Sequence, residues 1–312
     1  MTAPRRVRIE ARAKLNLGLA VGPRRPDGFH ELATIFQSVS LADTLVAERR
    51  RRGIRLQLRH PAAALRGVLP ARTRAAVPRG AANLAVRAAR LALREAHIVG
   101  GVSLRLVKRI PAQAGLAGGS ADAAAALTAV LALYGARVPL SDRLALGARL
   151  GSDVPFVLLG GTALGLGRGE RLTRLRPRRG FRAVIAVPEW RMPTGRAFWA
   201  LDRLRYGLTA WRAKLESAKA AGRLTLWPYG ALRLGNSFED VLGARLAEFV
   251  ELRARLREAG LHEPHLSGSG SAVFGLLGPH ADARRVLDRF RGSEALYVVR
   301  SVRRGLGVTR QT

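Results

Sequence analysis

The sequence predicts an α+β protein of two domains, and three observations carry this prediction. The chain has 312 residues, about twice the size of a typical domain. Apolar residues make up 48% of it, enough for ordinary buried cores and against global disorder. Strand-like and helix-like runs follow one another along the chain. The last part reads strand–helix–strand, which predicts a small α+β sandwich separate from the first half.

Hydrophobic spacing places the individual elements. Short runs with period-two alternation, or short apolar runs bounded by turn residues, predict strands at 7–9, 15–21, 32–41, 54–58, 102–107, two between 154 and 166, 183–187, 272–276 and 296–302. Helical spacing predicts helices at 83–95, 121–134, 141–150, 194–204, 208–220, 238–258 and 281–291. Asn83 suits the N-cap of the first helix. The segment 61–80 is rich in Ala, Arg and Pro and has weak periodicity, so we expect an irregular insertion there.

The chain is very basic, yet the form of the charge argues against a specific polyanion partner. It holds 54 Lys and Arg against 22 Asp and Glu, a net charge of +32, and only four of the basic residues are Lys. Ammonium binds phosphate as readily as guanidinium, so a surface selected for nucleic acid has no reason to avoid Lys. We therefore interpret the excess as a general preference for Arg and expect no specific nucleic-acid partner. Nonspecific attraction of RNA at low salt stays open.

Composition also excludes several classes of site and location. With no Cys, the chain has no disulfide, zinc-thiolate site, iron–sulfur cluster or cysteine nucleophile. The longest apolar stretch, 123–136, is 14 residues, short of the roughly 20 that a membrane span needs. The basic start lacks the apolar core of a signal peptide. We therefore expect a cytoplasmic protein with no membrane contact. Composition does not distinguish a monomer from a homodimer, so both stay open.

The strongest local signal is a glycine-rich loop between a predicted strand and an alanine-rich helix. Small residues at 114, 115 and 117–119 let backbone N–H groups approach a ligand closely. The helix that we expect to start near Ser120 adds unpaired N–H groups and a positive dipole end, which together favour phosphate. The loop lacks the Gly-Lys-Ser/Thr ending of a Walker A motif. A plain helix entry, with Ser120 as N-cap and Asp122 as a first-turn acid, is the alternative.

Asp122 bears on the choice between these two interpretations. A carboxylate beside a bound triphosphate is repulsive unless a cation lies between them, so the phosphate interpretation implies Mg²⁺. Ser120, and with less weight Asp122, are the candidate ligands, directly or through water.

Three further clusters carry polar residues suited to phosphoryl transfer. Lys14 and Asn16 share one face of a predicted strand. Asp153 lies in a tight Gly-Ser-Asp-Val-Pro corner, where a base can be held rigidly. Together Lys14 and Asp153 form the charged pair that could position and deprotonate an alcohol. A Gly/Ser turn at 267–271 precedes a buried strand and is the third cluster.

Taken together, the motifs resemble those of the GHMP small-molecule kinases, through nearly the whole length and in the right order. The matching segments are Ala13–Leu17, Arg25–Leu32, Asn83–Ala88, Gly115–Ala124, Gly151–Pro155, Pro193–Thr194 with Phe198, Gly235–Glu239 and Leu266–Phe274. The glycine loop is typical of the whole superfamily. The Asp27–Leu32 segment after Ala13–Leu17 is more selective, for the branch that phosphorylates a cytidyl-diphosphate-linked methylerythritol in non-mevalonate isoprenoid synthesis.

The resemblance implies a role for each matching residue. Asp153 would be the general base toward the substrate 2-hydroxyl, and Lys14 would lower the pKa of that hydroxyl and hold the γ-phosphate. ATP would be bound by Asn83, Lys108, Pro111, Gln113, Ala114, Gly115, Leu116, Ala117, Gly118, Gly119 and Ser120, with Asn83 and Lys108 at the adenine end. The cytidyl substrate would be bound by Asn16, Phe29, His30, Thr194, Phe198, Ser267, Gly268, Ser269 and Gly270. In this assignment His30 binds the edge of the cytosine by hydrogen bonds, and Phe29 and Phe198 stack on the two faces of the cytosine ring.

The resemblance also implies the fold and the cofactors. A ribosomal protein S5 domain 2-like domain (1–165) would precede a ferredoxin-like α/β plait (166–312), with the active site in the cleft between them. The cofactors would be ATP and Mg²⁺, the latter held mainly by ATP with Ser120. Phe29, Ala117 and Ala121 depart from the usual Tyr, Gly and Ser of the family, and Ala117 is tolerable if its φ stays negative. A homoserine or mevalonate kinase, or a basic RNA-binding protein of related fold, remain the alternatives.

Overall fold

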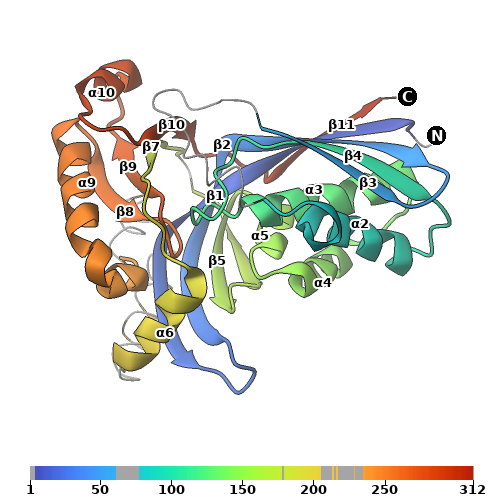
Figure 1. The fold of residues 1–312 in the computed structure, drawn as a ribbon, viewed down its shortest axis with the longest axis horizontal. Coiled ribbons are helices and arrows are strands. Elements are labelled where there is room, and N and C mark those ends of the chain that lie inside the picture. Colours follow the sequence, from blue (N-terminus) through green and yellow to red (C-terminus); the bar gives the residue numbers. More distant parts are fainter. Residues whose placement is uncertain are drawn as a thin grey trace.

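A seven-stranded sheet forms one half of the molecule (Figure 1). The structure is a computed structural model and describes residues 4–60, 77–177, 179–204 and 235–311, with the isolated positions 213, 216 and 228. The sheet follows the order β11-β1-β2-β4-β3, while β5 pairs with β2 and β6 with β5. Its strands are β1 (Arg6–Arg24), β2 (His30–Arg50), β3 (Ile54–Arg59), β4 (Gly101–Val107), β5 (Thr162–Gly167), β6 (Arg171–Leu175) and β11 (Leu306–Gln311). All pairs are antiparallel except β3 with β4.

Helices cover one face of this sheet (Figure 1). They are the turn η1 (Gly80–Ala82), α2 (Leu84–Glu95), α3 (Gly118–Leu133), α4 (Leu140–Leu150) and α5 (Val154–Leu159). α3 lies centrally and is buried almost all round, because its run of Ala121 and Ala123–Ala126 lets the sheet and the neighbouring helices approach closely. The alanine-rich helix is therefore a core helix whose N-terminus faces the other half of the molecule.

A four-stranded antiparallel sheet with the order β10-β7-β9-β8 forms the second half. Its elements are β7 (Arg182–Val187), α6 (Thr194–Leu204), η2 (Ser237–Val241), η3 (Gly243–Arg245), α9 (Leu246–Glu258), β8 (His262–Leu266), β9 (Val273–Leu277), α10 (Ala283–Arg289) and β10 (Ala295–Arg300). α9 packs its apolar face, including Phe249, Leu252 and Leu256, onto this sheet. The strand order is that of a ferredoxin-like plait, so the predicted α+β fold is confirmed.

The first strand connects the two halves, and its burial changes along its length. From Arg6 to Arg12 inward and outward residues alternate, whereas Ala13 to Gly22 are buried on both faces because the second half packs over them. Irregularities in the pairing with β2 occur between Arg12 and Lys14 and between Asn16 and Gly18. Such bulges redirect side chains, and here they flank both polar residues of the predicted Lys14–Asn16 cluster.

Several predicted elements need correction. The strands predicted at 7–9 and 15–21 are one strand, and the one at 32–41 extends over 30–50. The first of the two strands predicted between 154 and 166 is the helix α5, since Pro155 occupies its first turn, where the missing N–H costs nothing. The helix predicted from 238 begins as two 3-10 turns, and the strands β6, β8 and β11 were not predicted. Apart from positions 213 and 216, the predicted helix 208–220 lies outside the described residues, and so does most of the insertion 61–80.

The predicted division after residue 165 stays a prediction. The division falls inside β5, and β6 and β11, which follow it in sequence, pair with the first sheet. No helix in the described ranges is both long and apolar enough to cross a membrane.

Candidate active site

The glycine loop lies between β4 and α3 and is held by both halves of the molecule. The backbone N–H of Lys14 on β1 donates to the carbonyl of Leu116 at 3.2 Å, and that of Ala272 donates to Ala114 at 3.1 Å. Gly115 has φ +75°, and a Cβ there would lie 1.9 Å from the backbone oxygen of Ser267. Only glycine fits this crossing.

Two expectations for the loop are wrong. Helix α3 begins at Gly118 rather than near Ser120, so Ser120 is not its N-cap. The N-cap is Ala117, which adopts the left-handed conformation with φ 58° and ψ 31° instead of a negative φ. Close packing on both sides of the loop, at Gly115 and at the helix start, imposes this conformation on a residue that has a Cβ.

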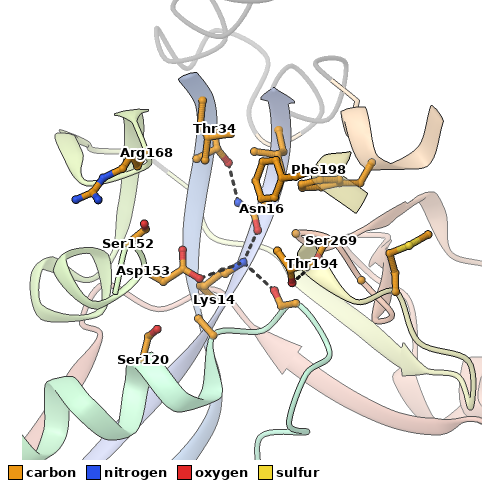
Figure 2. A pocket seen from close by; sticks show the side chains of 18 of the residues that line it. Lys14, Asn16, Thr34, Ser120, Ser152, Asp153, Arg168, Thr194, Phe198 and Ser269 are labelled. Atoms are coloured by element: carbon orange, nitrogen blue, oxygen red, sulfur yellow. Dashed lines mark hydrogen bonds and ion pairs between the residues drawn. The ribbon is translucent and has the colours of Figure 1, made fainter. Parts of the chain in front are cut away.

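Lys14 points into the space beside the loop (Figure 2). Its Nζ donates to Oδ1 of Asn16 and, at 2.8 Å, to the carbonyl of Gly115, and it lies 3.9 Å from Oδ2 of Asp153. Burial lowers the pKa of Lys14, and the attraction of Asp153 offsets this only in part. Asp153 is the N-terminal flanking residue of α5, with its side chain 33% exposed, so solvent reaches the carboxylate. The fold therefore brings together the two charged residues that the sequence placed far apart.

Asn16 is oriented by a hydroxyl that sequence reasoning missed. Its Nδ2 donates to Oγ1 of Thr34 at 2.8 Å, and Thr34 in turn donates to the carbonyl of Gly18 at 2.7 Å. The amide oxygen is left for Lys14. Thr34 belongs to no motif, and only the pairing of β1 with β2 shows its position.

Aromatic residues form the other end of the site. The rings of His30 and Phe198 are stacked, with centroids 4.9 Å apart, and His30 Nε2 lies 2.7 Å from Oδ1 of Asp202 on α6. Phe29 is 49% exposed, and the guanidinium of Arg168 lies 4.6 Å from its ring centroid. Sequence reasoning missed Asp202 and Arg168, which have no motif of their own.

The turn that precedes β9 completes the wall. Ser267 donates through its hydroxyl to Gly115 at 3.1 Å, and Thr194 and Ser269 share a hydrogen bond of 2.9 Å between their hydroxyls. Thr194 begins α6, so the turn connects the glycine loop to the helix that carries Phe198.

Most of the predicted site residues line one pocket of about 690 Å³. It contains Lys14, Asn16, Phe29, His30, Gln113, Gly115, Ala117, Ser120, Asp153, Thr194, Phe198, Gly268, Ser269 and Gly270. Behind the wall, or away from it, lie Asn83, Lys108, Pro111, Ala114, Leu116, Gly118, Gly119 and Ser267. Asn83 caps α2 as predicted, accepting from Ala85 N–H at 2.8 Å. Its contact with adenine stays a prediction.

Lys108 lies in a buried ionic cluster beneath the glycine loop. Its Nζ donates to Oδ2 of Asp43 and, at 2.6 Å, to Oδ2 of Asp122. Burial alone would lower the pKa of Lys108, but Asp122 and Asp43 together outweigh it and the pKa lies above its usual value. Burial raises the pKa of Asp122 well above its usual range, against the attraction of Lys108. Asp122 is thus neither a first-turn acid nor a residue of the pocket wall.

The comparisons with known proteins agree with this fold. Residues 83–161 match the family model described as the GHMP kinases N terminal domain. A solved 4-(cytidine 5'-diphospho)-2C-methyl-D-erythritol kinase matches 94% of this chain and 98% of its own, with a TM-score of 0.73 and 39% identity. A homoserine kinase from Cytophaga hutchinsonii reaches a TM-score of 0.74, covering 99% of both chains, at 18% identity. The second likeness shows the fold alone.

Fold and site together define a small-molecule kinase of the GHMP type. The 4-diphosphocytidyl-2-C-methyl-D-erythritol kinase of Moorella thermoacetica is 40% identical over 284 residues, which cover 91% of this chain and 94% of that protein. The enzyme of that name from Thermus thermophilus is 41% identical over 285 residues, covering 90% of this chain and 91% of its own. This chain belongs to the family of 4-diphosphocytidyl-2-C-methyl-D-erythritol kinases. The alternative of a non-enzymatic RNA-binding protein is therefore wrong.

Proposed function

We propose that the protein transfers the γ-phosphoryl group of ATP to the 2-hydroxyl of 4-diphosphocytidyl-2-C-methyl-D-erythritol, in the non-mevalonate route to isoprenoids. The observation that carries the proposal is the 3.9 Å approach of Lys14 to Asp153 at the edge of the glycine loop, in a pocket with the aromatic group of Phe29, His30 and Phe198. Membership of the family supports the choice of acceptor.

Asp153 is the general base in this proposal. Its carboxylate accepts the proton of the acceptor hydroxyl as the oxygen attacks the γ-phosphorus, and the bond from that phosphorus to the β-phosphate bridging oxygen breaks to release ADP. The exposed side of Asp153 then returns the proton to water. Lys14, already positioned by Asn16 and Gly115, stabilises the alkoxide and the γ-phosphate by its charge. Transfer is direct, so most of the rate enhancement comes from positioning and charge neutralisation.

The glycine loop, residues 113–120, holds the ATP phosphates, and its tight crossing at Gly115 is consistent with a main-chain cradle. A Mg²⁺ ion would supply charge neutralisation to the polyphosphate of ATP. Within the described residues, no group of three or more His, Asp or Glu could hold a metal by protein ligands alone. The Ser120 hydroxyl on the pocket wall fits a cation held mainly by ATP.

The acceptor is held across the rest of the pocket. Asn16 binds the methylerythritol part, and the Ser267–Gly270 turn and Thr194 lie beside the diphosphate and the nucleoside. His30 reads the cytosine edge, with its ring held by Asp202 and Phe198. Phe29 lines the same pocket and is half exposed, with Arg168 over its ring. In this proposal its ring stacks on the cytosine base.

An acceptor panel tests the proposal. With ATP and Mg²⁺, the purified protein should phosphorylate the cytidyl substrate and neither homoserine nor mevalonate, as followed by ADP release and product mass. Comparable kcat/KM on homoserine or mevalonate would reject the specificity, and no transfer to any acceptor would reject the activity.

The base is tested by Asp153→Asn, which should lower kcat by about 10²–10⁴. The matched control is Asp142→Asn, an exposed acid on α4 outside the pocket, which should keep the wild-type rate. An Asp153→Asn enzyme that turns over at the control rate would show that another group accepts the proton.

A further inference from the structure

Arg191 lies on the wall of the active-site pocket, in the segment between β7 and α6. Its Nη1 donates to Oε1 of Gln113 in the glycine loop at 2.8 Å. This contact runs from the second half of the molecule to the first. Gln113 itself has a positive φ of 56°, a backbone conformation that few non-glycine residues adopt. The glycine loop therefore fixes the backbone that carries this side chain.

One end of this guanidinium lacks a partner. Nη2 of Arg191 is shielded from solvent, yet it has no hydrogen-bond partner within the described part of the chain. A dry, unpaired donor on a charged group is costly. No carboxylate within the described ranges forms an ion pair with Arg191 either, in contrast to arginines such as Arg25 and Arg255. The hydrogen bond to Gln113 therefore fixes the guanidinium without neutralising its charge.

The charges around the pocket point to the kind of ligand that satisfies it. Among the described lining residues the basic side chains of Lys14, Arg168 and Arg191 face the single carboxylate of Asp153. Lys14 already has Asn16 and Gly115 as partners, and Arg168 covers the ring of Phe29. Arg191 is the cation of this wall that combines contact with the phosphate loop and a free, buried N–H.

We propose that Arg191 binds a phosphate group at the mouth of the glycine loop and so becomes a further phosphate-binding residue of the kinase reaction. This inference rests on the proposed function. The ligand is a phosphate group, whose oxygens a guanidinium can contact in pairs. Two sources share this chemistry, the triphosphate of ATP and the diphosphate of the acceptor. In either case the bound phosphate would contact Arg191 of the second half beside the glycine loop of the first half. On the transferring group the charge of Arg191 also stabilises the transition state.

Steady-state kinetics of Arg191→Gln test the proposal and separate the two sources. Loss of a hydrogen bond to a charged group should lower kcat/KM roughly 10- to 150-fold. If only the KM for ATP rises, Arg191 binds the triphosphate of the nucleotide. If only the KM for the acceptor rises, Arg191 binds the diphosphate of the acceptor. A fall in kcat with both KM values unchanged assigns it to the transferring phosphoryl group. Arg196→Gln, which removes the same charge from an exposed position on α6 outside the pocket, is the matched control.

Arg191→Gln kinetics within about twofold of this control would overturn the proposal. Arg191→Lys keeps the charge without the planar fork and should fall between wild type and Arg191→Gln. It also provides the kinetic test if Arg191→Gln does not fold, and wild-type kinetics for both variants would again overturn the proposal.

A binding measurement keeps this inference distinct from the proposed function. Calorimetric titration with inorganic tripolyphosphate needs no acceptor and no turnover. Weaker binding by Arg191→Gln than by Arg196→Gln supports a phosphate site even if no acceptor is phosphorylated. If the wild type transfers phosphate normally but Arg191→Gln matches the control in both kinetics and binding, this inference fails while the proposed function stands.

Discussion

Replacing Lys108 by Met should destabilise the protein strongly, although Lys108 lies outside the pocket wall. The Lys108 ammonium lies between Asp43 and Asp122, and the exposed fractions of these two side chains are 0% and 3%. Asp43 keeps two backbone donors, the N–H groups of Arg109 and Ile110. Asp122 keeps no hydrogen-bond donor among the described residues. Its Oδ2 accepts from Lys108 and its Oδ1 already has no partner. Removing one partner of a buried pair costs about 3–5 kcal/mol.

The midpoint of thermal unfolding converts this free energy into a measurable shift. At about 2.1 cal/mol/K per residue, the entropy of unfolding of this chain is near 0.66 kcal/mol/K, so the loss corresponds to roughly 5–8 °C. Arg149→Met is the control, since Arg149 pairs with Glu95 at 3.3 Å with its side chain 51% exposed. Such exposed pairs contribute about 0–1 kcal/mol. A Lys108→Met protein that melts with the control would refute the view that this ionic cluster supports the loop.

The same variant should show a particular dependence on pH. Burial raises the pKa of Asp122 above its ordinary value of 3.8, so the folded state binds this proton more tightly than the unfolded state does. The associated stability is present below that ordinary value and is lost as the pH rises through the raised pKa. Without Lys108 the penalty for ionising Asp122 grows, so the difference from wild type should be smallest at acid pH and widen toward neutrality. Adding Asp122→Asn should recover part of the lost stability by removing the unpaired charge.

Two further predictions concern the loop and its lysine. Ala117→Gly should stabilise the protein by about 0.5–1 kcal/mol, because glycine adopts the left-handed conformation of residue 117 without a Cβ penalty. Urea unfolding measures this, and a lower midpoint would contradict the strain inferred there. Burial lowers the pKa of Lys14, so its charge should be lost at a pH below the ordinary 10.5. In the proposed mechanism this charge holds the γ-phosphate, so kcat should decline there on the alkaline side. An alkaline limb at or above 10.5, from a pH–rate profile, would show that Lys14 keeps its ordinary pKa.

The secondary structure was predictable where one local pattern dominated. Asn83 was expected as an N-cap and does cap α2, and the strand 54–58 has the alternation of an edge strand. The short apolar run after Asp153 could not be assigned from its spacing, because a run of so few residues fits a buried strand and a helix equally well. The strand β11 escaped notice because its residues are mostly exposed and therefore show little hydrophobic alternation.

The site was predictable to the extent that its residues belong to motifs. The glycine loop, Lys14, Asn16 and Asp153 were all singled out, and the structure places them around one pocket. The residues that were missed have partners distant in sequence and carry no local signature. Asp43 lies beneath the loop only because β2 passes there, and Asp202 reaches His30 only because α6 packs on the strand ends.

The amino-acid sequence by itself determined the type of most elements, the small residues of the loop and the shared face of Lys14 and Asn16, because these depend on neighbours a few positions away. Tertiary structure alone decided that Asp153 meets Lys14, that Lys108 faces inward to two carboxylates, and that Arg191 reaches Gln113. It also imposed a left-handed backbone on Ala117. The physical reason is that sheet pairing and the packing of two separate cores set these distances, and the periodicity of a single segment contains no information about either.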